Sequence, residues 1–102
     1  VLGVYRITKT YPADEKFGLV NQSRRAAVSI SSNVAEGFGR FSGKDKHHFY
    51  SIAKTSLAEL QNQLIIAHDL KYISIDEFNE LYTQSDTVGS LIKGLMRAVS
   101  NR

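Results

Sequence analysis

Apolar residues recur at spacings of three and four along three long stretches of this chain, the spacing that lines one face of an α-helix. The stretches cover residues 12–38, residues 43–70 and the segment after Ser74. No segment alternates apolar and polar residues as a half-buried β-strand does. The pattern therefore predicts an all-α protein whose long helices each bury one face.

Turn-forming residues set the predicted ends of the first helices. Pro12 suits the first turn of the first long helix, because its missing N–H needs no partner there. We expect Gly37 and Gly39 to end that helix in the left-handed conformation that glycine adopts without strain. A short helix over residues 1–8 precedes it. Because the chain begins with Val1 instead of Met, we expect the true start of that helix to be missing.

Serine caps are predicted at the starts of the other two long helices. Ser42 has a carboxylate three residues later, at Asp45, and the run Ser74–Glu77 is a capping box. The connections are only a few residues long, so consecutive helices must run antiparallel. We therefore expect residues 1–102 to form one domain, an antiparallel up-down-up-down four-helix bundle whose first helix is short or truncated.

The three- and four-residue spacing also predicts which side chains face the core. In the first long helix these are Phe17, Val20, Arg24, Ala27, Val28, Ser31, Val34, Ala35 and Phe38. In the second they are Phe49, Ile52, Ala53, Ser56, Leu57, Leu60, Leu64, Ala67 and Leu70. In the third they are Phe78, Leu81, Tyr82, Ser85, Val88, Ile92, Leu95, Met96 and Val99.

Further apolar residues lie beside the predicted core faces, at Ile65, Ile66, Tyr72, Ile75 and Leu91. A single bundle of this size has limited room for them, and a homo-oligomer is the simplest way to cover a second apolar face. Scattered apolar residues on a surface are the alternative. We favour oligomerisation.

Residues 22–40 carry polar side chains that a helix used only for packing does not need. Such groups require hydrogen-bond partners wherever they are buried. Arg24 and Arg25 diverge by about 100° around the helix axis, so we expect them to face different partners. Glu36 and Arg40 are four residues apart and can pair directly. A polar stripe is predicted at Arg25, Ser29, Ser32, Asn33 and Glu36.

This polar stripe has two interpretations. A polar seam fixes the register of a bundle or the packing of subunits, as a core asparagine does in coiled coils. The alternative is a stripe that binds a ligand or a nucleic acid. We favour the polar seam.

Positive charge is concentrated in the first half of the chain. Residues 1–48 contain eight Lys/Arg and four Asp/Glu, a formal charge of +4, whereas residues 49–102 contain five and six, a charge of −1. Basic side chains cluster at one turn, which suits phosphate binding, although a solvated turn is an equal alternative. This basic turn consists of Arg40, Lys44, Lys46, His47 and His48.

Enzyme chemistry has no clear pattern in the sequence. The chain has no cysteine, which removes thiolate metal sites and cysteine nucleophiles and fits a reducing cytoplasm. The nearest match to a di-iron motif is Asp45-x-x-His48, and nothing repeats it. No nucleophile elbow or phosphate loop occurs, so we expect no enzymatic activity, no metal and no cofactor. No apolar run reaches the roughly 18–20 residues of a membrane span, so we expect no membrane partner.

Three segments together resemble one protein family. They are Tyr11-Pro12-x-x-Glu15, the run from Gln22 to Arg40, and Ala53-x-x-Ser56-Leu57-x-Glu59-Leu60. Over about residues 1–100 the chain resembles the four-helix-bundle proteins encoded in intervening sequences of bacterial 23S ribosomal RNA genes. Lys54-Thr55 departs from the Arg-Gly that the family often has before the serine. Family members usually have a longer first helix.

The resemblance implies a four-helix bundle that assembles into a ring-like homopentamer. It also implies kinship with the accessory variability determinant of diversity-generating retroelements, a basic partner of a reverse transcriptase and nucleic acid. Most family members have no established activity, and the family name reports gene location. The family motif falls on Arg24, Arg25, Ser29, Asn33, Glu36, Gly37, Gly39 and Arg40, and on Ser56 and Glu59 in the predicted helix over residues 43–70.

We therefore expect a non-enzymatic, oligomeric helical adaptor in the cytoplasm that binds structured RNA or a ribonucleoprotein through the basic turn. A purely structural or protein-interaction module without nucleic-acid binding is the alternative. The candidate nucleic-acid-binding residues are Arg24, Arg25, Arg40, Lys44, Lys46, His47 and His48. The candidate assembly residues are Ser29, Asn33, Glu36, Gly37, Gly39, Ser56 and Glu59.

Overall fold

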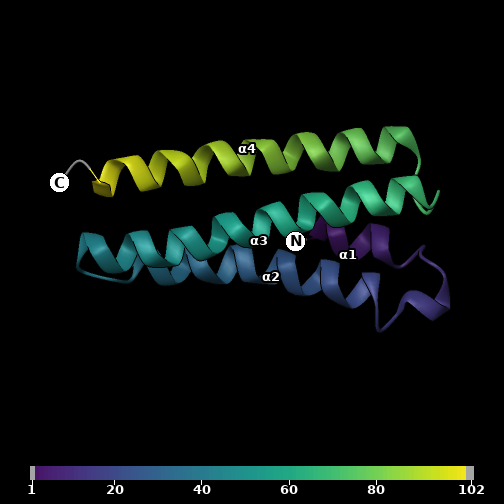
Figure 1. Cartoon of the computed structure of the whole chain (residues 1–102), viewed down its shortest axis with the longest axis horizontal. Helices are drawn as coiled ribbons and strands as arrows, with labels where there is room; N and C mark the ends of the chain where they lie inside the picture. Colours follow the sequence, from purple (N-terminus) through teal and green to yellow (C-terminus); the bar gives the residue numbers. More distant parts are fainter. Residues whose placement is uncertain (1, 101–102) are drawn as a thin grey trace.

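The structure, a computed structural model, describes residues 2–100, and these form four α-helices, one short 3₁₀ helix and no strand. Consecutive α-helices run antiparallel, and α3 lies between α2 and α4 (Figure 1). The all-α, antiparallel four-helix prediction is confirmed. The elements are α1 (Leu2–Thr8), the 3₁₀ helix η1 (Ala13–Glu15), α2 (Leu19–Phe38), α3 (Gly43–Asp69) and α4 (Ile75–Ser100).

Helix α1 is short, as predicted. Val1 and the side chain of Leu2, both assigned to this helix from the sequence, lie outside the described residues. The molecule measures 46 × 24 × 17 Å. It is elongated along the long helices and therefore has two well-separated ends. The α2–α3 turn lies at one end and the α3–α4 turn at the other (Figure 1).

Helix α2 begins at Leu19 and not at Pro12, so the predicted start was wrong. Pro12 does precede a helical turn, but only the single 3₁₀ turn of η1. The backbone then leaves the helical region at Gly18, where φ is −103° and ψ is −107°. Apolar residues keep the three- and four-residue spacing on both sides of Gly18, so the spacing alone did not reveal that the helix begins only at Leu19.

Both predicted serine caps are present. The backbone N–H of Asp45 donates to the Ser42 hydroxyl at 3.1 Å, and α3 starts at the next residue after that serine. At the start of α4 the capping box is complete. The Glu77 N–H donates to Ser74 Oγ at 3.1 Å, and the Ser74 N–H donates to Glu77 Oε1 at 2.9 Å.

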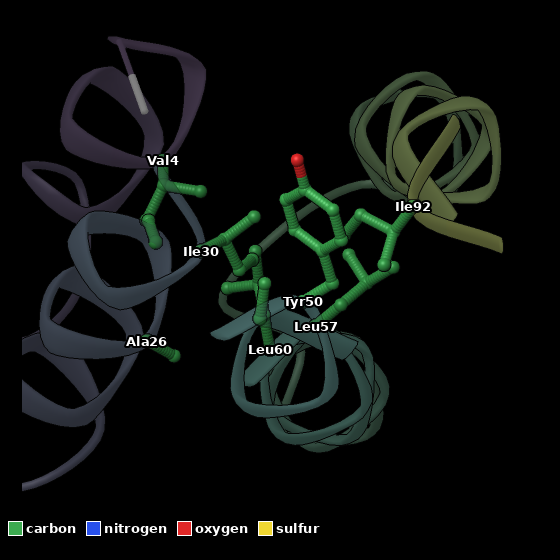
Figure 2. Packing of buried hydrophobic residues seen from close by; sticks show 9 residues of the cluster. Val4, Ala26, Ile30, Tyr50, Leu57, Leu60 and Ile92 are labelled. Carbon is green, nitrogen blue, oxygen red and sulfur yellow. The ribbon is translucent and has the colours of Figure 1, made fainter. Parts of the chain in front are cut away.

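Buried apolar side chains from all four α-helices form a core centred on α3. Tyr50 of α3 and Ile92 of α4 are the largest fully buried side chains, each 1% exposed. Tyr50 and Leu57 project from α3 between Ile30 of α2 and Ile92 of α4 (Figure 2). Helix α3 therefore supplies the layer that joins α2 to α4.

The buried faces of α3 and α4 follow the predicted spacing, but that of α2 does not. Phe17, Val28 and Phe38 were predicted in the core and are 85%, 43% and 61% exposed. Leu70, at the end of α3, is also exposed. The buried positions of α2 include small residues, so its backbone lies close to α3 and bulky side chains are displaced from the contact line. These buried positions are Leu19, Val20, Ser23, Ala26, Ala27, Ile30 and Gly37.

Tyr11, before α2, and Tyr72, in the α3–α4 turn, connect these two segments. The Tyr72 hydroxyl donates to Glu15 Oε2 at 2.8 Å, and this hydrogen bond raises the pKa of Tyr72. The rings of Tyr11 and Tyr72 lie 5.5 Å apart. Burial, and then the nearby charge of Glu77, raise the pKa of Tyr11 to about 12. These contacts therefore hold the segment before α2 against the α3–α4 turn.

Within residues 2–100, none of the helices combines the length and the apolar character that crossing a lipid bilayer requires.

Candidate nucleic-acid interface and polar seam

The basic turn follows the C-terminus of α2, and Lys46 holds that terminus in place. Its ammonium donates to the carbonyl oxygens of Gly37 and Phe38, both at 3.1 Å. These carbonyls belong to the last turn of α2, where cations are favoured by the helix dipole and by unpaired oxygens. Lys46 therefore stabilises the turn, and its ammonium group is partly occupied by hydrogen bonds to backbone carbonyl oxygens.

Arg40 lies on the surface of the turn. Its guanidinium donates to Glu36 Oε2 at 3.2 Å, which confirms the predicted pair. The same group stacks over the ring of Phe49 at 4.7 Å from the ring centre. Both members of the ion pair are about half exposed, so the pair is weak and leaves Arg40 accessible.

The remaining basic side chains of the turn differ in how far they are engaged. Lys44 is exposed. His47 Nδ1 lies 3.5 Å from the Ser51 hydroxyl, and the ring of His48 packs edge-on against Phe49 at 5.2 Å. The structure thus gathers all the residues of the basic turn at one end of the molecule, as the sequence predicted.

Two exposed phenylalanines accompany these charges. Phe41 is completely exposed. Phe38 is 61% exposed, and its ring packs edge-to-face with the ring of Tyr50, the two ring centres being 6.1 Å apart. Sequence reasoning missed Phe41 and assigned Phe38 to the core. A usable signal was present, because Phe41 falls between the two predicted helices, next to Arg40 and Ser42, where no helix face can bury it.

Polar side chains at the centre of α2 hydrogen-bond to α3. The hydroxyls of Ser29 and Ser56 lie 2.7 Å apart, and either can donate. The Asn33 amide donates to the carbonyl oxygen of Ser29 at 2.8 Å and to its hydroxyl at 3.1 Å. We call Ser29, Asn33 and Ser56 the polar seam. Ser56 is buried and Ser29 and Asn33 are half-buried, and all three have the partners that burial demands, so they link the two helices at one register.

Gly37 is required by the close approach of α2 to α3. A Cβ atom built on Gly37 would lie 2.4 Å from Cε1 of Tyr50, which is far inside van der Waals contact. Neither Gly37 nor Gly39 has a positive φ angle, so the predicted left-handed caps were wrong. Gly39 has a right-handed helical backbone conformation and donates its N–H to carbonyl oxygens of the last turn of α2. The Lys46 ammonium binds further carbonyl oxygens there, so the helix end needs no residue in the left-handed conformation.

Arg24 and Arg25 differ in their surroundings. Arg24 Nε donates to the Thr8 hydroxyl at 2.9 Å, and its guanidinium lies 4.7 Å from the ring centre of Tyr5, so it joins α2 to α1. Arg25 is exposed. Arg24 thus contacts α1, whereas Arg25 lies beside side chains of α3, so the two arginines have different neighbours, as expected, although both border one open pocket.

Glu59 lies on the exposed side of α3 beside the polar seam. Together with Arg25, Ser29 and Ser56 it lines a second polar pocket, of about 540 Å³. The candidate assembly residues thus lie in two places, at this pocket with the polar seam and near the α2 terminus. Among residues 2–100, no three His, Asp or Glu side chains gather as metal ligands would.

An antiparallel helical bundle with a polar seam and a basic turn defines the class of this protein. Residues 1–94 match the family model for the 23S rRNA-intervening sequence protein. The chain belongs to this family, as its motifs indicated. Among curated proteins no match is found. The family description states no biochemical activity, so function has to be argued from the site.

Proposed function

We propose that this protein is a non-enzymatic, oligomeric adaptor that binds structured RNA through the α2–α3 turn. The observation that carries the proposal is Phe41, whose side chain is completely exposed between Arg40 and Lys44. A fully exposed ring contributes nothing to the core, whereas unpaired bases stack on such rings. The neighbouring cations suit the phosphates on either side of a stacked base.

The chemistry of the turn favours RNA that presents unpaired bases, such as the loop of a hairpin. A continuous duplex offers no free base face to Phe41 or Phe38, so it would engage only the charges. Arg40 is accessible and paired with a single exposed carboxylate, which a phosphate can replace at small cost. Binding is therefore expected to weaken as salt concentration rises.

We further propose that the protein acts as a homo-oligomer in the cytoplasm, in the pentameric ring that the family resemblance implies. Exposed apolar side chains on α3 and α4 support assembly, because such residues become buried between subunits. They include Ile65 at 40%, Ile66 at 39% and Leu91 at 65% exposure. A ring of five chains, each with a net charge of +3, would raise the local attraction for a polyanion.

The RNA proposal is tested with a fluorescently labelled RNA hairpin whose anisotropy reports binding. Phe41→Ala is expected to raise the Kd at least about fivefold, since stacking of one base on an aromatic ring contributes about 1–3 kcal/mol. Phe17→Ala is the matched control, because Phe17 is also exposed and lies beside a lysine, Lys16, before α2. Equal affinities of the wild type and the Phe41 variant would overturn the proposed role of the turn.

A structural module without RNA binding is the second candidate, and one observation favours it. Lys46 is engaged by backbone carbonyls and Arg40 by Glu36, so part of the charge of the turn already has partners. This candidate predicts that Ile66→Glu dissociates the oligomer in light scattering, whereas Ala58→Glu, exposed on the same helix, does not. It also predicts no retention of RNA at any salt concentration.

A further inference from the structure

A second basic feature lies away from the turn, on the first half of α2. Arg24 is held in one orientation by two contacts, the hydrogen bond from its Nε to Thr8 Oγ1 and the stacking of its guanidinium on Tyr5. These contacts occupy one edge and one face of the guanidinium. A planar guanidinium has further N–H groups in a fixed fork that fits phosphate oxygens. The ordering of this side chain is therefore provided by the fold before any ligand binds.

The surroundings of Arg24 supply hydrogen-bond donors and no carboxylate. It opens onto a shallow pocket of about 420 Å³. Among the ion pairs found within residues 2–100, none involves Arg24 or Arg25. The pocket is lined by Tyr5, Asn21, Arg24, Arg25, Val28 and Ser29.

We propose that Arg24 and Arg25 bind a backbone phosphate of the RNA whose loop contacts the α2–α3 turn. This inference rests on the proposed function and adds a second contact point to it. Arg24 supplies a preorganised fork, Arg25 supplies a second positive charge, and the Asn21 amide can donate to a remaining phosphate oxygen. An uncharged ligand would leave the Arg24 guanidinium without a counter-charge and fits this pocket less well.

The position of the pocket suits such a second contact. Arg25 and Glu36, the residue that pairs with Arg40, are eleven residues apart, close to three full helical turns. Their side chains therefore leave the same side of α2, separated by about 16 Å along its axis. An RNA stem of about ten base pairs is longer than this separation, so one hairpin can reach both points.

The test measures how RNA affinity depends on salt for Arg25→Gln, since Arg25 is exposed and its loss leaves the contacts of Arg24 with α1 intact. We expect a Kd about five- to tenfold higher and a slope of log K against log salt reduced by about 0.7–0.9, the loss of one phosphate contact. Arg6→Gln is the matched control, because Arg6 is an exposed arginine that faces the carboxylate of Glu80. The control is expected to change neither quantity.

A second measurement separates failure of this inference from failure of the proposed function. The arginine Nε–H signals of ¹⁵N-labelled protein are followed by NMR while inorganic phosphate replaces chloride at constant ionic strength. A saturable shift of the Arg24 or Arg25 signal supports the site even if no RNA binds. If RNA binds but Arg25→Gln leaves the salt slope unchanged, or if no arginine signal responds to phosphate, the inference is overturned.

Discussion

The two turns at opposite ends of α3 each begin the next helix with a serine cap and differ in what surrounds them. Ser42 and Asp45 cap α3, and Ser74 and Glu77 cap α4. At the α3–α4 turn, Ile73 is buried and Tyr72 contacts Tyr11 and Glu15, although Leu70 and Ile75 are about half exposed. At the α2–α3 turn, Phe41 is left completely exposed beside basic side chains.

The difference arises from a segment distant in sequence. Tyr11 and Glu15 precede α2, yet they pack against the α3–α4 turn. No equivalent segment covers the α2–α3 turn within residues 2–100. A serine cap therefore identifies where a helix starts, but tertiary packing decides whether the turn before it becomes a packed structural corner or an exposed surface.

The largest expected effect is at the junction beneath the α2–α3 turn. Gly37→Ala would place a methyl group against the ring of Tyr50, which is fully buried. Overpacking of this kind is expected to lower the free energy of unfolding by about 3 kcal/mol. Urea denaturation followed by circular dichroism measures the change.

Gly94→Ala is the matched control for this prediction. Nothing lies within 4 Å of a Cβ built at Gly94 in α4, so alanine gains helix propensity there without a clash. The expected result is a gain of up to about 1 kcal/mol. Destabilisation by both alanines, or by neither, would contradict the close approach of α2 to Tyr50.

The second prediction concerns alkaline pH and the α3–α4 turn. The pKa of Tyr11 is about 12 in the folded protein and about 10 in the unfolded chain, so the folded state favours the neutral, protonated hydroxyl of Tyr11. This contribution is complete below pH 10 and is lost as pH rises towards 12, by about 1–2 kcal/mol with solvent screening included. Tyr11→Phe is expected to flatten this decline in unfolding experiments at pH 9 to 12. An equally steep decline in the variant would exclude Tyr11 as its source.

The third prediction compares the two caps directly. Ser74→Ala breaks a reciprocal capping box and is expected to cost about 1–1.5 kcal/mol of stability. Ser42→Ala removes a single hydrogen bond to the Asp45 N–H and is expected to cost about 0.5–1 kcal/mol. Thermal unfolding of both variants under identical conditions gives the order. The reverse order would show that the cap at the exposed turn matters more than its geometry indicates.

Local signals predicted the features that depend on neighbours in sequence. The caps at Ser42 and Ser74, the Glu36–Arg40 pair and the span of α3 all follow from residues a few positions apart. The fold class followed because periodic apolar faces permit few arrangements.

Features set by distant contacts could not be obtained in this way. The segment of η1 before α2 is held by the Glu15–Tyr72 hydrogen bond to the α3–α4 turn, and the orientation of Arg24 depends on Tyr5 and Thr8 of α1. Phe17 and Phe38 continued the helical spacing but lie on the surface, since spacing does not reveal how closely α2 approaches α3.

Hydrogen–deuterium exchange of the intact protein with and without an RNA hairpin tests the contrast between the two turns most directly. Peptides from each turn are compared at an RNA concentration where binding is saturated. The account predicts slower exchange over residues 38–48 on RNA binding and unchanged exchange over residues 70–77. Protection confined to residues 70–77, or unchanged exchange at both turns, would contradict it.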